Sequence, residues 1–167
     1  MAASDVMEAS QYLTFKLAGE VFALGISRVR EVLDYTPVTR IPEAPDFMLG
    51  VINLRGNVVP VLDMRLKFGM DSNEKKANSC IIIVEIELEG ETILLGALAD
   101  SVQAVLEIGP DQMEPPPRMG AGLKSKFIKA MGKHEGEFLI ILDIDKVFST
   151  EELAMTQEPQ QALAAAS

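Results

Sequence analysis

The stretch LAGEVFALGISRVREVL, residues 17–33, decides the fold, because it recurs as LEGETILLGALADSVQAVL, residues 88–106. Both copies carry a turn glycine, a Leu-Gly pair and a closing Val-Leu pair. The segments that follow them match as well, since Phe47, Gly56 and Asp63 recur as Phe127, Gly136 and Asp143. Chance similarity of short apolar strings is the alternative, but it does not explain agreement at turn glycines and apolar positions together. The chain is therefore predicted to be an internal duplication.

Short runs of Val, Ile, Leu and Phe separated by glycine-containing turns are typical of β-strands in a sandwich or barrel. Hairpins are predicted at 18–20, 55–57 and 89–91, with a fourth at 134–137, because each has a glycine between two β-rich runs. Few helices are expected, and all of them are short. Asp63 and Asp143 are placed to cap two of them, and Ser149 with Glu152 forms a capping box for a final one.

The fold class expected from this pattern is all-β, with short helices and a C-terminal helix. Each repeat supplies about five strands, and closure into two small five-stranded barrels of the SH3 or OB type removes exposed sheet edges. The first barrel is expected mainly over 17–70 and the second mainly over 79–148. Together they form one domain over 11–155, between flexible tails at 1–10 and 156–167.

The charge of the chain argues against polyanionic partners. The formal net charge is -10, and the basic residues form no long stripe. Nucleic acid and an anionic membrane surface are therefore not expected as partners. The N-terminus MAASDVMEAS has no basic segment followed by an apolar one, and no apolar run is long enough to span a bilayer. We expect a cytoplasmic protein with no direct membrane insertion.

Residues suited to catalysis or metal binding are few, so no enzyme activity, metal or cofactor is predicted. Cys80 heads the apolar run CIIIV, where a small thiol is core packing. His134 lies in a predicted turn, and one histidine with one distant cysteine makes no metal site. Helix capping accounts for Asp63 and Asp143 better than acid–base chemistry does. The pattern favours a module that binds other proteins, and a small-ligand-binding β-barrel remains the alternative from another class.

Several motifs then carry a family resemblance. They are VREVL at 29–33, TRIP at 39–42, NLRG at 53–56 and VVPVLD at 58–63. With the later segments 99–106 and 127–144, they make the chain resemble the CheW family over about Gln11 to Leu153. NLRG followed by VVPVLD is the most specific part.

The resemblance implies a non-catalytic chemotaxis adaptor with two intertwined β-barrels and a hydrophobic seam. Its partners would be the regulatory domain of a CheA-type histidine kinase and the cytoplasmic hairpin tip of a chemoreceptor. The implied receptor-binding residues are Val29, Glu31, Gly50, Asn53 and Arg55. Val105, equivalent to Val32 by the repeat but in the second barrel, is a further candidate, with plain core packing as the alternative. Among them, Glu31 and Arg55 are the family's paired charges, although a solvated ion pair would look the same. A coupling module of a related, non-chemotaxis kinase pathway would also fit.

The loop EPPPRM, residues 114–119, is expected to be extended and exposed because three consecutive prolines stiffen it. In the CheW family this region approaches the kinase, so Met119 is the predicted kinase contact. An ordinary connector is the alternative. Methionine suits such a contact because its side chain adapts to different partner surfaces.

Overall fold

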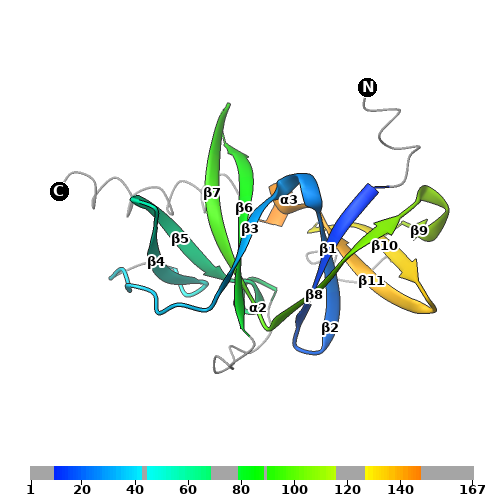
Figure 1. The fold of residues 1–167 in the computed structure, drawn as a ribbon, viewed down its shortest axis with the longest axis horizontal. Helices are drawn as coiled ribbons and strands as arrows, with labels where there is room; N and C mark the ends of the chain where they lie inside the picture. The colour runs from blue at the N-terminus through cyan, green and yellow to red at the C-terminus, as the bar shows by residue number, and fades with distance from the viewer. Residues whose placement is uncertain (1–9, 43–44, 69–78, 89, 116–126, 148–167) are drawn as a thin grey trace.

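A computed structural model describes residues 10–42, 45–68, 79–88, 90–115 and 127–147 (Figure 1). The expected C-terminal helix, the tail at 156–167 and nearly all of the N-terminal tail lie outside these residues. The first seven elements are β1 (Ser10–Leu17), β2 (Glu20–Gly25), η1 (Ile26–Arg28), β3 (Val29–Asp34), β4 (Met48–Leu54), β5 (Asn57–Asp63) and α2 (Met64–Lys67). The remaining elements are β6 (Cys80–Leu88), β7 (Glu91–Ala99), β8 (Ser101–Ile108), η2 (Pro110–Gln112), β9 (Met113–Glu114), β10 (Ile128–His134), β11 (Glu137–Leu142) and α3 (Ile144–Val147).

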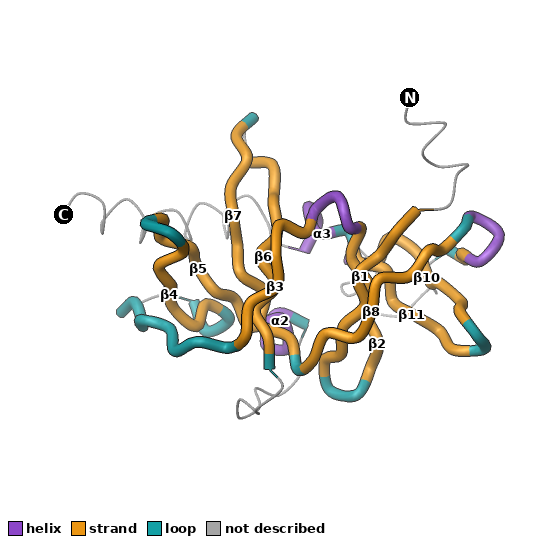
Figure 2. Tube along the Cα trace, in the orientation of Figure 1, coloured by secondary structure: helices purple, strands orange, loops and turns teal. Residues whose placement is uncertain are grey.

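The strands form two sheets that lie side by side along the long axis of the molecule (Figures 1 and 2). One sheet has six strands in the order β8-β1-β2-β11-β10-β9, and the other has five in the order β3-β6-β7-β5-β4. Helices in the described residues are single short turns beside the sheets. The prediction of an all-β fold with short helices is confirmed.

The two sheets do not coincide with the expected spans 17–70 and 79–148, because the repeats exchange their first hairpins. The β1–β2 hairpin lies in the sheet that holds β8 to β11, and the β6–β7 hairpin lies in the sheet that holds β3 to β5. Each exchanged hairpin pairs with the other repeat on both of its sides. The pairing is antiparallel in β1–β8 and β3–β6. It is parallel on the other side, where Phe22 of β2 is opposite Ile140 of β11 and Val61 of β5 is opposite Gly96 of β7. After each hairpin the chain crosses to the other sheet.

Matched irregularities confirm the duplication. The β4–β5 pair shifts register between Met48 and Gly50, and the β10–β11 pair shifts between Ile128 and Ala130, at equivalent positions. Equivalent backbone bonds follow in both repeats: Asp63 N donates to Phe47 O at 2.6 Å, and Asp143 N donates to Phe127 O at 2.9 Å. The two repeats therefore share bulges and corner bonds as well as sequence.

Three hairpins use two-residue turns with both central residues at positive φ. This backbone matches the right-handed twist of the flanking strands, so it sets the strand register. The turn residues and their φ values are Ala18 (52°) and Gly19 (84°), Arg55 (52°) and Gly56 (88°), and Glu135 (50°) and Gly136 (82°). The glycine-based hairpin predictions are confirmed at these three turns.

Aromatic rings run through the junction between the sheets. Phe22 of β2 lies 5.9 Å from Phe15 and 5.7 Å from Phe68, measured between ring centroids, and Phe68 lies 5.7 Å from Phe127. All four belong to one buried cluster that includes residues from both repeats. The two sheets therefore share a central core cluster, and each sheet also has a smaller buried cluster of its own.

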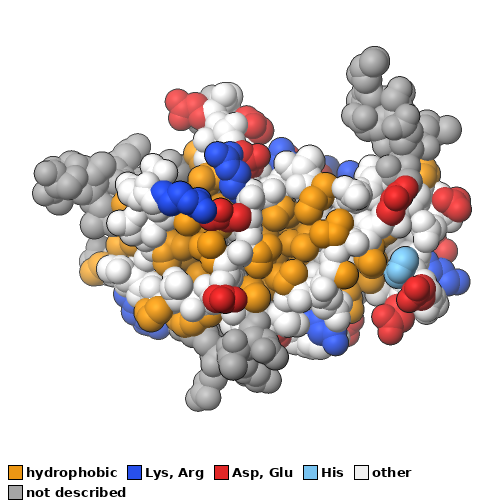
Figure 3. Space-filling model, in the orientation of Figure 1, with side chains coloured by type: hydrophobic (Ala, Val, Ile, Leu, Met, Phe, Trp, Pro, Cys, Tyr) orange, Lys and Arg blue, Asp and Glu red, His pale blue; other side chains and the backbone are white. Residues whose placement is uncertain are grey.

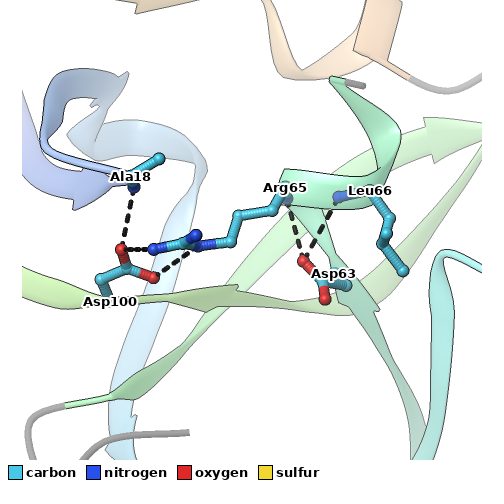
Figure 4. A network of polar contacts seen from close by, with 5 residues as sticks. All are labelled: Ala18, Asp63, Arg65, Leu66 and Asp100. Carbon is cyan, nitrogen blue, oxygen red and sulfur yellow. Dashed lines mark hydrogen bonds and ion pairs between the residues drawn. The ribbon is translucent and has the colours of Figure 1, made fainter. Parts of the chain in front are cut away.

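A buried polar network fixes one of the two crossovers (Figure 4). Arg65 of α2 binds Asp100, which lies between β7 and β8, with two donors; Nε donates to Oδ1 at 3.0 Å and Nη2 to Oδ2. Asp100 Oδ2 also accepts from Ala18 N at 2.9 Å in the β1–β2 turn. Asp63 caps α2 by accepting from Arg65 N at 2.9 Å. One aspartate thus joins the α2 turn, the crossover and the opposite sheet.

Asp143 occupies the place of Asp63 in the second repeat but holds its helix differently. Its carbonyl accepts from Lys146 N at 2.9 Å, and its carboxylate lies 3.8 Å from Lys146 Nζ. The expected carboxylate cap is therefore seen at Asp63 and not at Asp143. The solvent-exposed lysine at 146 offers the second carboxylate another partner.

Replacing Asp100 by alanine should lower the free energy of unfolding by about 2–3 kcal/mol, because hydrogen bonds to charged groups contribute more than neutral ones. Arg65 is only 12% exposed, so water replaces the lost carboxylate poorly. Urea denaturation at neutral pH measures the change. Arg30→Ala is the control, since Arg30 is 58% exposed in its pair with Glu85 and should change stability by less than about 1 kcal/mol. Equal losses of unfolding free energy in the two variants would contradict a structural role for the Arg65–Asp100 contact.

Candidate protein-docking site

The candidate site lies where the two edges of the five-stranded sheet approach each other. The edge strands are β3 and β4. The sheet curls until Arg55, in the β4–β5 turn, reaches Glu31 on β3, and Arg55 Nη2 donates to Glu31 Oε2 at 2.8 Å. The structure therefore brings together the two charged residues that the sequence predicted as a pair.

Electrostatics keeps both partners charged. The hydrogen bond from Arg55 lowers the pKa of Glu31, and the positive charges of Arg55 and Arg30 lower it further. Partial desolvation of the carboxylate acts in the opposite direction, but the net shift is downward. The same bond raises the pKa of Arg55. At neutral pH the site presents a carboxylate beside a guanidinium.

The pair is only partly satisfied. Arg55 is 71% exposed, so most of its five donors face solvent. Glu31 Oε1, in contrast, is shielded from solvent and has no hydrogen-bond partner among the described residues. A shielded carboxylate oxygen without a donor is unfavourable. The part of the pair that a partner can reach is therefore the exposed guanidinium of Arg55.

Gly50 allows the backbone beside this surface to pack closely. It is buried in β4 at φ 155°, and a Cβ atom there would lie 2.3 Å from the backbone oxygen of Thr39. Thr39 and Val51 exchange two backbone hydrogen bonds of 2.8 Å at this point. The absence of a side chain lets the segment after β3 add to the β4 edge.

Asn53 also acts through the backbone. Its Oδ1 accepts from Gly56 N at 2.8 Å, which holds the turn that carries Arg55. Asparagine commonly stabilises turns in this way. Although exposed, Asn53 has one face of its amide engaged inside the turn.

The predicted valines lie in both sheets. Val29 begins β3 and is half-buried against the shared core, whereas Val105 lies on β8, an edge strand of the six-stranded sheet, and is 49% exposed. Val32 on β3, which is equivalent to Val105 by the repeat, is 40% exposed. Figure 3 shows hydrophobic side chains across the middle of the face where Figure 1 places β3 and β8.

Val32 was missed as a candidate site residue. The signal available was the alternation of VREVLD, in which Arg30, Val32 and Asp34 share the outward face of β3. Met119, the predicted kinase contact, lies outside the described residues.

The buried polar side chains of the described residues serve the fold. They are Thr14, Asp63 and Ser79. Thr14 Oγ1 donates to Ala104 O at 3.0 Å, and Asp63 caps α2. Within the described ranges no three His, Cys, Asp or Glu side chains are grouped to hold a metal ion, and no helix there is long and apolar enough to cross a membrane.

The carboxyl pKa of Glu31 should rise in Arg55→Ala, because its main stabilising hydrogen bond is lost. In the wild type the lowered pKa means that the Glu31–Arg55 interaction is present above the ordinary glutamate pKa and disappears as pH falls through the lowered value. Side-chain carboxyl NMR titration measures both proteins. Glu87→Gln is the control, because it removes a charge on the neighbouring strand and should leave the pKa of Glu31 unchanged. An unchanged Glu31 pKa in Arg55→Ala would contradict the pairing.

Comparisons with known proteins agree with the fold. Residues 11–152 match the CheW-like domain family. Chemotaxis protein CheW of Klebsiella aerogenes is 34% identical, covering 87% of this chain and 85% of the relative, and that of Rhizobium meliloti is 30% identical, covering 85% and 89%. A crystal structure of the scaffolding protein TtCheW from Thermoanaerobacter tengcongensis superposes with a TM-score of 0.75 at 35% identity, covering 84% of this chain and 93% of that one. The chain therefore belongs to the CheW family of chemotaxis scaffold proteins.

Proposed function

We propose that this chain couples the regulatory domain of a CheA-type histidine kinase to the cytoplasmic hairpin tips of methyl-accepting chemotaxis proteins. It would do so in the cytoplasm, recruited to receptor arrays at the inner face of the membrane, with no reaction of its own. The observation that carries the proposal is the Glu31–Arg55 pair, which spans the two sheet edges and leaves most donors of Arg55 facing solvent. Membership of a chemotaxis scaffold family supports it.

The receptor surface would combine charge with apolar contact. Arg55 offers free donors in a planar fork, suited to backbone carbonyls or carboxylates at a helical hairpin tip. Val32 on β3 and Val105 on β8 offer exposed apolar area on one edge strand of each sheet. Charged groups of this kind set orientation, and the apolar contacts add affinity. Val29, Gly50 and Asn53 would support the surface by placing β3, β4 and the turn.

Coupling requires a second surface for the kinase. Met119 in the proline-rich loop remains the proposed contact, on the ground of its sequence and the family resemblance alone. Two surfaces on one small rigid body raise the effective concentration of one partner near the other, so docking by itself brings kinase and receptor together.

Mixing the chain with a CheA-type kinase and a receptor signalling fragment should yield a ternary complex, and the kinase's autophosphorylation rate should change when all three are present. Analytical ultracentrifugation and a radiolabelled-phosphate assay measure the two effects. Pairwise mixtures are the controls. Absence of a ternary complex together with an unchanged autophosphorylation rate would contradict the proposed adaptor function.

Arg55→Ala and Glu31→Gln should each weaken binding of the receptor fragment by about tenfold or more while leaving kinase binding unchanged. Both side chains lie at the surface, so the midpoint of thermal unfolding should stay near that of the wild type. Calorimetric titration and a thermal melt measure the two properties. Arg30→Ala is the matched control on the same strand, with its charge paired to Glu85.

A large loss of thermal stability in Arg55→Ala, with receptor affinity unchanged, would assign Arg55 to the scaffold. Arg55→Gly separates the backbone from the side chain, because glycine adopts the turn's positive φ without strain. Arg55→Gly should bind the receptor fragment as weakly as Arg55→Ala does. Its midpoint of thermal unfolding should equal or exceed that of Arg55→Ala.

A further inference from the structure

The two crossovers between the sheets are held by ion pairs of opposite polarity. In one, Arg65 of α2 binds Asp100 beside β8. In the other, Asp145 of α3 binds Arg28, the last residue of η1 before β3. Arg65 and Asp145 occupy equivalent places in the repeats, each two residues after an aspartate that precedes the helix. The duplicated fold thus uses the same contact twice with the charges exchanged.

The two contacts differ in how firmly they are held. Asp100 has further bonds, since its carboxylate accepts from Ala18 N and its own N–H donates to Lys16 O. The η1 turn has no buried residue and no side-chain cap. In the described part of the chain, the Arg28–Asp145 pair is the one side-chain hydrogen bond from η1 to another element.

Open space lies beside the second contact. A surface pocket of about 240 Å³ is lined by Gly25, Ser27 and Arg28 on one side and by Ile144 and Asp145 on the other. The pocket leaves the Arg28–Asp145 contact open to solvent, although Ile26 of η1 packs against the core cluster that contains Ile144 and Val147 of α3. The ion pair therefore adds a polar contact to this apolar packing in setting how η1 lies against α3.

The η1 turn leads directly into the candidate docking site. Val29 follows Arg28, and Glu31 lies two residues further along β3. The pairing of β3 with β6 shifts register between Val29 and Glu31, so the direction of the Glu31 side chain depends on how the chain enters the strand. A displacement of η1 would move the carboxylate relative to Arg55.

We propose that Arg28 is a positioning residue for the receptor surface, and that Asp145, on the second repeat's helix, sets the placement of Glu31 through it. This inference rests on the proposed receptor-binding function. It gives α3 a part in receptor binding although α3 belongs to the other repeat. A change at α3 would reach the docking site through one ion pair and a three-residue turn.

Asp145→Asn in the full chain tests the proposal, because it weakens the pair without altering β3 or Arg55. We expect a shift of the Glu31 carboxyl and Arg55 side-chain NMR signals, faster amide exchange at the start of β3, and about fivefold weaker binding of the receptor fragment. The midpoint of thermal unfolding should change little, since both side chains are partly exposed. The charge-swapped double variant, Arg28→Asp with Asp145→Arg, should restore the NMR signals and the affinity.

Lys146→Ala is the matched control on the same helix, because Lys146 pairs with Asp143, the residue that precedes α3, and not with Arg28. It should leave the Glu31 signals and the affinity as in the wild type. Unchanged Glu31 signals in Asp145→Asn, or a double variant no better than the single ones, would overturn the proposal. If the wild type itself fails to bind the receptor fragment, the proposed function fails, and the NMR signals alone then decide the positioning role.

Discussion

The parallel pairing of hairpins from opposite repeats is the constraint on which the rest of this structure depends. β2 is completed by β11 and β5 by β7, so each sheet closes only when both repeats have contributed to it. Parallel strands require a long connection: most of the chain lies between β2 and β11, and β5 reaches β7 through α2 and β6. Neither repeat can bury its apolar face alone. Both must therefore fold together, with many contacts far apart in sequence, which favours slow and cooperative folding.

Exchange also changes the size of the core. Two separate barrels of about 70 residues would each bury a smaller fraction of their surface than one domain of twice that size, and would be marginally stable. The exchanged sheets add a large shared cluster to the smaller one inside each sheet, and in it Phe22, Phe68 and Phe127 connect elements from both repeats. A shared cluster couples the packing of the two sheets, so neither can be displaced without disturbing buried side chains of the other.

The local parts of this fold could be predicted from sequence, and the long-range parts could not. Turn glycines such as Gly19 and Gly56 and the cap at Asp63 act within a few residues, so a short pattern reveals them. The exchange leaves no such mark, because a hairpin has the same sequence pattern whichever sheet it joins; that the barrels intertwine was expected from the family resemblance alone. The Arg65–Asp100 contact was missed for the same reason. The Glu31–Arg55 pair was expected from the family resemblance, since nothing in either segment alone shows that two sheet edges meet.

The repeats are equivalent in backbone but differ in their charged side chains. The Glu31–Arg55 ion pair therefore occurs in one repeat only, where a symmetric molecule would have it twice. The positions equivalent to Glu31 and Arg55 in the second repeat are Ala104 and Glu135, which cannot form an ion pair. There the edge of the sheet is extended by β9, which pairs with β10. A symmetric module would present the same surface twice and could not distinguish receptor from kinase. Charge at one edge and its absence at the other therefore permit a duplicated fold to bind two different partners.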